Sequence, residues 1–533
     1  MTDGATADLA AAAAAVSLAR GVVDAAAASV AARGGVDANQ VIAYDLAHAA
    51  AGVAIAGTAL DYGALGDVEG RLACAFVADM VVDLATKVLG REVDWGTVPG
   101  WSGPLEGFLA TWRRPELLAG LCGEQGPRHL SEDFELVRTT FHRFAEDKVR
   151  PHAEHVHRSN DDVPEEIILG LGELGGFGLS VPESYGGFAT GGESDYLGMV
   201  VATEELSWGS LAIGGSLMTR PEILTRALVR GGTEDQKRHW LPKLATAEVL
   251  AAVAVTEPDF GSDVAGITTS ATPIEGGWLI NGVKTWCTFA ARAEVLMLLA
   301  RTDPDRAKAH RGLSMFIVEK PVGDGHGFVF DQERAELPGR LEGRPIDTIG
   351  YRGMHSYELA FENWFVPAAN LVGEAEGEGK GFYLQMQGFE NGRLQTAARA
   401  LGVMQAAYEA AFAYATERMV FGTPVLDYQL TQVKLARMAV IIQAARQFAY
   451  EVARRMAKGE GAMEASMVKA YVCRAAEWVT REALQIHGGM GYAEEFPVSR
   501  YFVDARVLSI FEGADETLAL KVIARRLVAN AQG

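Results

Sequence analysis

The stretch Ser509–Glu516 reads Ser-Ile-Phe-Glu-Gly-Ala-Asp-Glu and lies near the C-terminus, after a long helical run. Glycine lets the backbone turn tightly and approach a ligand closely. Glu512, directly before Gly513, is therefore expected where a helix gives way to a loop. Phe511 would exclude water from one side of its carboxylate, and burial disfavours the charged form of an acid, which can tune it into a general base. A helix C-cap with a solvated glutamate is the alternative, and motifs elsewhere in the chain decide between the two.

Length and charge limit the classes of function open to the chain. Its 533 residues are enough for about three or four domains with large cores. The formal net charge of −21 argues against nucleic acid or an anionic membrane surface as a partner, whereas an anionic substrate would need only local positive charge. The cysteines are far apart and lack the spacing of a metal or redox site. This usage is typical of a reduced, cytoplasmic protein, and no metal is expected.

Residues 1–127 predict an Ala-rich helical extension, because alanine is the strongest helix former. The apolar run at residues 9–32 is interrupted by Arg20 and Asp24, and no basic segment precedes it. A soluble helix is therefore expected there rather than an export or membrane element. The extension shows no catalytic cluster, which favours a role in packing or assembly.

The rest of the chain divides by the period of its hydrophobic residues. Helical spacing over residues 128–250 gives way to short β-like runs over residues 251–370, bounded by Gly, Asn and Pro. Helical spacing returns over residues 371–533, in four long amphipathic segments that predict a bundle. Strands are expected at Ala251–Val255, Trp278–Ile280, Val295–Leu299 and Leu313–Val318.

Four further motifs carry chemistry. The stretch Val255–Asp263 is dense in hydroxyls and free backbone N–H groups, which can bind a planar heterocycle and a pyrophosphate. In a strand, Trp286 and Thr288 would point to the same side and suit the edge of a flavin ring. The other two motifs are Glu417–Gly422, with Gln429 beyond it, and the glycine turn Gln485–Tyr492. Each motif is weak alone, but their order, followed by Phe511-Glu512-Gly513, is a strong signal.

With these motifs, residues 131–530 resemble the acyl-CoA dehydrogenase family. The resemblance implies an α+β fold with an N-terminal helical domain, a central β domain and a C-terminal four-helix bundle, preceded here by the helical extension. It implies that FAD binds between the last two domains and a neighbouring subunit of a homo-oligomer, a dimer or a tetramer. The expected division is 1–127, 128–250, 251–370 and 371–533.

The resemblance also implies a set of FAD contacts, carried over motif by motif. Thr256 and Ser262 match positions that contact flavin and substrate, and Trp286 and Thr288 match the pair beside the flavin ring. The remaining positions match contacts to the diphosphate, the adenosine or the FAD of the partner subunit. They are Arg418, Phe421, Gln429, Gln485, Gly488, Gly489 and Glu516.

For the substrate, the resemblance makes Glu512 the catalytic base. Some members of the family place the base directly before the arginine that corresponds to Arg393, but that position is Gly392 here. Arg393 matches an arginine near the CoA moiety, and Phe389 and Ser262 are further expected substrate contacts. The usual threonine after the Glu-Gly pair is Ala514, so a hydroxyl contact to the flavin is missing.

Three local stretches, Thr348–Glu358, Gly392–Arg399 and Phe511–Ala514, together with the extension, resemble one subfamily most, the (2S)-methylsuccinyl-CoA dehydrogenases. That subfamily implies conversion of methylsuccinyl-CoA to mesaconyl-CoA in the ethylmalonyl-CoA pathway, with electrons passed to electron-transferring flavoprotein. A buried distal carboxylate of the substrate needs a cation, because an unpaired buried charge is costly. Arg220 is the candidate, on an expected helix Ser216–Val229 where Ile213, Leu217 and Arg220 would share one face, and Arg352 and His355 are rivals.

Two other readings stay open from the sequence. One is a short- or branched-chain dehydrogenase of monocarboxylic acyl-CoA esters. The other is a non-catalytic flavin-binding assembly protein, against which the intact Glu512 and flavin motifs argue.

Overall fold

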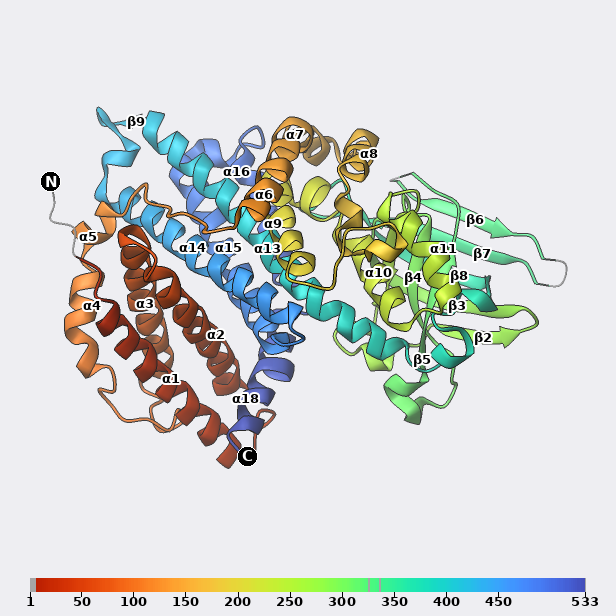
Figure 1. Ribbon diagram of the computed structural model, residues 1–533, viewed down its shortest axis with the longest axis horizontal. Coiled ribbons are helices and arrows are strands. Elements are labelled where there is room, and N and C mark those ends of the chain that lie inside the picture. The colour runs from red at the N-terminus through yellow and green to blue at the C-terminus, as the bar shows by residue number, and fades with distance from the viewer. Residues whose placement is uncertain (1–5, 325, 335–336, 533) are drawn as a thin grey trace. The chain divides into compact units, whose positions relative to one another are not determined.

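The computed structural model describes residues 6–324, 326–334 and 337–532, apart from the side chain of Arg220 (Figure 1). The chain forms two compact units. The first comprises Met1–Leu136 together with Thr396–Gly533, and the second comprises Val137–Gln395. The extension and the C-terminal region therefore fold together as one body. The division into four domains made from the sequence stays a prediction.

The extension is helical over most of its described length, as expected. Its long helices are α1 (Leu9–Ala32), α2 (Gln40–Gly63) and α3 (Asp67–Val88), and two short ones follow, α4 (Glu106–Trp112) and α5 (Pro115–Gly120). The side chain of Asp8 caps α1 by accepting a hydrogen bond of 2.9 Å from the backbone N–H of Ala11. Gly34 and Gly35, both with positive φ, follow the end of α1 and turn the chain towards α2.

The C-terminal part of the first unit holds the bundle. Its helices are the later part of α13 (Gly381–Glu417), α14 (Gln429–Ala457), α15 (Ala462–His487), α16 (Pro497–Leu508), α17 (Asp515–Thr517) and α18 (Arg525–Asn530). Helix α2 packs against α14 and α15, and α3 packs against α14, as Figure 1 shows within this unit. By length and hydropathy α1 and α2 could each cross a bilayer, but both pack against other helices of the unit, as core helices do.

The second unit begins with helices. They are most of α6 (Glu132–Phe144), then α7 (Arg150–Ser159), α8 (Glu165–Glu173), α9 (Ser194–Gly209), α10 (Thr219–Gly231) and α11 (Glu234–Ala245). The helix expected from Ser216 begins only at Thr219, because residues 216–218 form a turn after the π-helical segment Leu211–Gly215. The expectation that Ile213, Leu217 and Arg220 share one helical face is therefore wrong, since their spacing crosses this turn.

The sheet of the second unit has the order β1-β4-β2-β3-β8-β7-β6, with β5 paired to β4. Its strands are β1 (Ala251–Ala254), β2 (Ser270–Ile274), β3 (Gly277–Thr288), β4 (Val295–Arg301), β5 (Leu313–Glu319), β6 (Phe328–Gln332), β7 (Gly339–Ile346) and β8 (Ser356–Pro367). Three of the four expected strands fall within β3, β4 and β5, and the fourth coincides with β1 except for Val255, which follows its end. Helix α10 packs against β1, and α10, α11, β1, β4 and β5 contribute side chains to a shared core. This core thus holds the end of β1 in place, and the motif Val255–Asp263 begins directly after it.

Candidate active site

Glu512 lies in the loop between α16 and α17, in the first unit. Its φ of +53° and the φ of +100° at Gly513 bend the backbone sharply, as glycine permits and as glutamate rarely allows. The side chain of Glu512 is 5% exposed. Its Oε1 accepts a hydrogen bond of 2.7 Å from Nη2 of Arg399, and its Oε2 accepts one of 3.0 Å from Oγ1 of Thr396. The alternative of a solvated glutamate at a helix C-cap is therefore wrong.

Arg399 brings a full positive charge to this carboxylate. Its side chain, on α13, is completely buried, and Nη2 also donates to Oγ1 of Thr396 at 2.8 Å. The guanidinium lies 4.7 Å from the ring centroid of Phe511, a cation–π contact on the cation of the pair. The expectation that Phe511 excludes water from the Glu512 carboxylate stays a prediction. A cation at this distance favours the ionised form of an acid. The arrangement thus sets the Glu512 carboxyl against a buried cation and a hydroxyl donor.

Buried contacts fix the loop beyond Glu512 as well. The carbonyl oxygen of Gly513 accepts a hydrogen bond of 2.7 Å from Nζ of Lys469, on α15. Burial lowers the pKa of Lys469, against the effect of nearby acidic groups that include Glu512 and Asp515. The backbone N–H of Asp515 donates to the carbonyl oxygen of Ser509 at 3.1 Å, which closes the loop on itself. The backbone around Glu512 is thus held from two sides.

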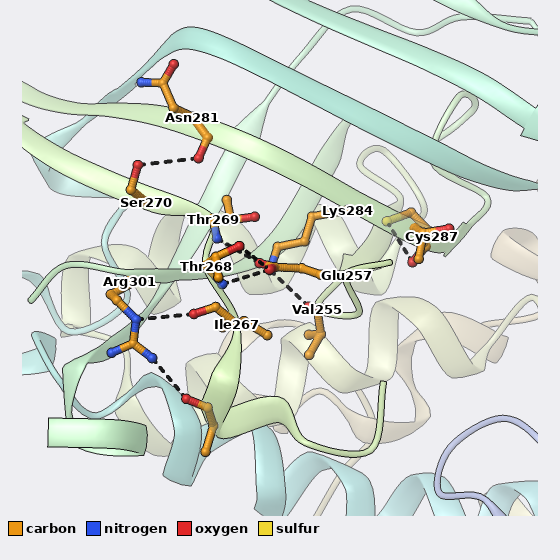
Figure 2. A network of polar contacts seen from close by, with 12 residues as sticks. Val255, Glu257, Ile267, Thr268, Thr269, Ser270, Asn281, Lys284, Cys287 and Arg301 are labelled. Carbon is orange, nitrogen blue, oxygen red and sulfur yellow. Dashed lines mark hydrogen bonds and ion pairs between the residues drawn. The ribbon is translucent and has the colours of Figure 1, made fainter. Parts of the chain in front are cut away.

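In the second unit, a buried ion pair fixes the loop that follows β1 (Figure 2). Nζ of Lys284 lies 2.9 Å from Oε1 of Glu257 and also donates to the carbonyl oxygen of Val255 at 2.9 Å. The Glu257 carboxylate further accepts from the backbone N–H groups of Thr268 and Thr269, at 2.7 and 2.8 Å. Burial raises the pKa of Glu257, but Lys284 and these donors outweigh it and lower that pKa to about 2. The network joins the end of β1 to the middle of β3.

Near this network, two residues that are expected to contact the flavin, Thr256 and Trp286, lie on neighbouring stretches of backbone. The backbone N–H of Thr285 donates to the carbonyl oxygen of Thr256 at 2.8 Å, so Thr256 lies beside the segment that carries Trp286. Trp286 has a φ of +57° and is 56% exposed. The pairing with β8 shifts register between Lys284 and Cys287. Regular strand alternation therefore does not apply at Trp286, and the expected shared side of Trp286 and Thr288 stays a prediction.

Two residues complete this set in the second unit. Thr288 is buried, and its hydroxyl lies 2.9 Å from the hydroxyl of Ser356 on β8. Ser262 is exposed in the loop after β1. The expected flavin contacts of this unit thus combine hydroxyls with one exposed aromatic ring.

In the first unit, Arg418 and Phe421 lie at a hairpin between β9 (Met419–Val420) and β10 (Thr423–Pro424). Phe421 and Gly422 both have positive φ, at +51° and +79°, which is the backbone of a two-residue hairpin turn. Phe421 is 97% exposed. Holding a non-glycine residue at positive φ costs free energy, and such residues are found mostly at ligand sites and other functional positions. Gln429 is exposed at the first residue of α14.

The glycine turn after α15 lies next to the helix end that leads into this hairpin. Tyr414, on α13, stacks on His487 with ring centroids 4.3 Å apart, and His487 directly precedes Gly488. A Cβ atom built at Gly488 or Gly489 would meet nothing within 4 Å, so the turn opens onto free space. Gln485 is exposed near the end of α15, and Glu516 is exposed in α17.

The expected substrate contacts of the second unit come from two neighbouring helices. Phe389 and Arg393 are half-buried on α13, and burial lowers the pKa of Arg393. A hydrogen bond from the side-chain amide of Asn391 to Glu222 joins α13 to α10. Arg220 lies in the first turn of α10, and its side chain is outside the described part of the chain.

The two rivals of Arg220 already have partners. Arg352 donates from Nη1 to the carbonyl oxygen of His157 at 2.9 Å, and Nε2 of His355 lies 3.0 Å from the carboxylate of Asp162. A substrate carboxylate would compete with Asp162 for His355, and the guanidinium of Arg352 is anchored to the carbonyl oxygens of Thr348 and His157.

Comparison with known proteins identifies the family. Models of the N-terminal, middle and C-terminal domains of acyl-CoA dehydrogenases match residues 131–248, 252–364 and 379–528. The chain belongs to the acyl-CoA dehydrogenase family. It is an FAD-dependent oxidoreductase that acts on acyl-CoA, with the family fold expected from its sequence.

Relatives and solved structures agree with this assignment. A (2S)-methylsuccinyl-CoA dehydrogenase of Cereibacter sphaeroides is 45% identical over 404 residues, which cover 76% of this chain and 71% of that protein. A complex of glutaryl-coenzyme A dehydrogenase with glutaryl-CoA has a TM-score of 0.67 at 31% identity, and the match covers 76% of this chain and 96% of that one. A glutaryl-CoA dehydrogenase of Mycobacterium smegmatis in complex with FADH2 has a TM-score of 0.63 at 27% identity, over 76% of this chain and 95% of that one.

The residues present suit FAD. A flat ring system needs open aromatic faces, and Trp286 and Phe421 expose theirs. A pyrophosphate needs backbone that it can approach closely, and Gly488 and Gly489 leave that space free. Arg418 is an exposed cation for the same charge. Among the described residues, no group of three or more His, Cys, Asp or Glu side chains is placed to hold a metal ion.

The sequence analysis did not identify the charged residues that hold the loop of Glu512 and the loop after β1 in place. These residues are Arg399, Lys469, Glu257 and Lys284. A signal was present for Arg399, a lone charge between the apolar residues Ala397, Ala398, Ala400 and Leu401 of an expected helix. A lone charge in such a stripe is either at the edge of the buried face or paired inside it, and only the partner decides which.

Proposed function

We propose that the enzyme desaturates a short, branched dicarboxylyl-CoA, converting (2S)-methylsuccinyl-CoA to mesaconyl-CoA as in the ethylmalonyl-CoA pathway. Electrons then pass to electron-transferring flavoprotein, in the cytoplasm, and the active form is a homo-oligomer. The observation that carries the proposal is the buried Glu512 carboxylate, which is paired with Arg399 in a loop of positive φ. The similarity to a methylsuccinyl-CoA dehydrogenase supports the choice of acyl group.

Glu512 removes the α-proton of the thioester. The proton is weakly acidic, so its removal needs an ionised base already in place and stabilisation of the enolate that develops. Arg399 donates a hydrogen bond to the carboxylate, and the ring of Phe511 lies against the Arg399 guanidinium. The resemblance assigns the enolate oxygen to the backbone N–H of Glu512, and losing one such donor costs about 2.7–4 kcal/mol. When bound, FAD supplies the acceptor for the hydride that leaves the β-carbon.

A dicarboxylic substrate brings a second negative charge that must be paired. We assign this charge to Arg220, in the first turn of α10, a helix joined to the substrate helix α13 through Glu222 and Asn391. The rivals Arg352 and His355 are engaged elsewhere, with His157 and Asp162. An arginine offers a fork of donors that matches a carboxylate.

The test of the base is Glu512→Gln, studied without oxygen. The variant should keep bound FAD, because the amide fills the same space, but its rate of flavin bleaching by acyl-CoA should fall by orders of magnitude. A rate within a few-fold of the wild type would remove Glu512 from the mechanism. An intact bleaching reaction in the wild type separates an enzyme from a non-catalytic flavin protein.

The acyl group is tested with a panel of CoA esters under the same conditions. Methylsuccinyl-CoA should give the highest kcat/KM, above succinyl-, glutaryl-, butyryl- and isovaleryl-CoA. If a monocarboxylic ester is preferred instead, the enzyme is a short- or branched-chain dehydrogenase. Reoxidation of the reduced enzyme by purified electron-transferring flavoprotein, compared with oxygen, tests the acceptor, and light scattering gives the oligomeric state.

A further inference from the structure

The loop that carries Glu512 is bound by the N-terminal extension. Asp515 accepts a hydrogen bond from the hydroxyl of Tyr44 and lies 3.1 Å from Nε2 of His48, both on α2. The side chain of His48 is 6% exposed and that of Asp515 is 11% exposed. More than 460 residues separate these partners along the chain. The contact is therefore a buried, tertiary one.

The charge of Asp515 depends on these partners. Burial raises the pKa of Asp515, but hydrogen bonding and charge from His48, with the hydroxyl of Tyr44, outweigh burial and lower it. The guanidinium of Arg474, on α15, lies 6.0 Å from the ring centroid of Tyr44 and adds a positive charge nearby. Asp515 is thus a buried carboxylate stabilised mainly by two side chains of the extension.

The position of Asp515 sets the position of Glu512. Only Gly513 and Ala514 lie between them, and the backbone N–H of Asp515 closes the loop onto Ser509. A shift of Asp515 would therefore pass directly to the base. Catalysis is sensitive to such shifts, since a displacement of about 1 Å can cost about 100-fold in rate.

We infer that Tyr44 and His48 of the extension are positioning residues of the catalytic loop, acting on Glu512 through Asp515. The inference rests on the proposed role of Glu512 as the base. It gives the extension a part in the reaction, in addition to its packing against α14 and α15.

The chain offers a matched control for the extension. Asp37, just before α2, pairs with Lys521 and Arg525 at 3.1 and 2.8 Å near the C-terminus. This contact also joins the extension to the C-terminal helices, but it is exposed and does not involve the loop of Glu512. Asp37→Asn should therefore weaken the attachment of the extension without moving the base.

The experiment compares four variants of the full-length holoenzyme. They are Tyr44→Phe with His48→Ala, Tyr44→Phe with His48→Gln, Tyr44→Phe alone, and Asp37→Asn. For each variant, bound FAD, melting temperature, kcat and KM are measured with methylsuccinyl-CoA or the best ester of the panel. The kcat of the first variant should fall about 10- to 100-fold per bound FAD, with KM within about two-fold of the wild type.

The second variant should recover most of kcat, because the amide of glutamine can donate from the place of Nε2. Tyr44→Phe alone removes one hydroxyl and should lower kcat by a few-fold. This single variant still tests the inference if the double variant does not fold. Asp37→Asn should stay within about two-fold of the wild type.

Three results would overturn the inference. They are an unchanged kcat in the first and third variants, a loss of kcat that only follows the loss of FAD or folded protein, and an equal loss in Asp37→Asn. Glu512→Gln separates this failure from that of the proposed function. If Glu512→Gln is inactive while the Tyr44 and His48 variants are fully active, only the positioning role is wrong.

Discussion

Nη2 of Arg399 and Oε1 of Glu512 lie 2.7 Å apart in a site where the two side chains are 0% and 5% exposed, although 113 residues separate them in the chain. Moving both charged groups out of water costs several kcal/mol for each ion, and the attraction between the paired ions must offset that cost. Glu512 and Arg399 are therefore coupled in their contributions to stability.

A double-mutant cycle on this pair should show that coupling. Arg399→Met leaves a buried carboxylate without its cation and should lower the free energy of unfolding by about 3–5 kcal/mol. Adding Glu512→Gln should recover part of that loss, because no unpaired charge remains. Denaturant unfolding of the wild type, both single variants and the double variant measures the cycle. Strictly additive effects would contradict the coupling, and Arg399→Lys, which keeps the charge, should be the mildest change.

The buried pair of Glu257 and Lys284 should make stability depend on pH. The pKa of Glu257 is lowered from 4.5 to about 2, so its stabilisation is complete above about pH 4.5 and is lost as the pH falls towards 2. In Lys284→Met, burial is opposed only by the hydrogen bonds from Thr268 and Thr269, so the pKa of Glu257 should lie above its wild-type value. This variant should be less stable by about 3–5 kcal/mol at pH 7, and its deficit relative to the wild type should shrink as the pH falls from 4.5 towards 2.

Melting temperature as a function of pH measures both effects. The exposed pair of Arg238 and Glu234 is the control, since Arg238→Met there should change the melting temperature little. The same pH profile in Lys284→Met and in the wild type would contradict the argument.

Arg220→Ala should separate dicarboxylic from monocarboxylic substrates. Without a cation for the distal carboxylate, KM for methylsuccinyl-CoA should rise by at least about 10-fold, since a hydrogen bond to a charged group contributes about 1.5–3 kcal/mol. KM for butyryl-CoA should stay nearly constant. Steady-state kinetics with both esters measures the difference. Arg230→Ala, near the other end of α10, should affect neither ester, and an equal rise for both esters in Arg220→Ala would contradict the assignment.

Gly513→Ala should damage the loop itself. Alanine at a φ of +100° is strained by about 1–2 kcal/mol, and its Cβ would lie 3.0 Å from a side-chain carbon of Leu518. We expect a lower melting temperature and a lower kcat with FAD still bound. Gly107→Ala, within α4 and with free space at its Cβ, should instead gain up to about 1 kcal/mol. A fully active and equally stable Gly513→Ala protein would show that the backbone at this turn is not critical.

The sequence by itself determined the family and the order of helical and β segments, and it singled out Glu512 as the candidate base, because these depend on local period and on short motifs. Glu512 before Gly513 and the strand at Val295–Leu299 are examples. It did not predict the bulge at Trp286 or the turn that delays α10 to Thr219, since both arise from how neighbouring backbone pairs.

Only the tertiary structure decided which charges are paired. Arg399 with Glu512, Lys284 with Glu257 and His48 with Asp515 join residues from distant parts of the chain. No local period records such a pairing, because a buried charge is stable only through a partner that folding brings to it. For the same reason, the sequence shows an Ala-rich extension with no catalytic cluster. The fold places α2 of that extension against the loop that carries Glu512.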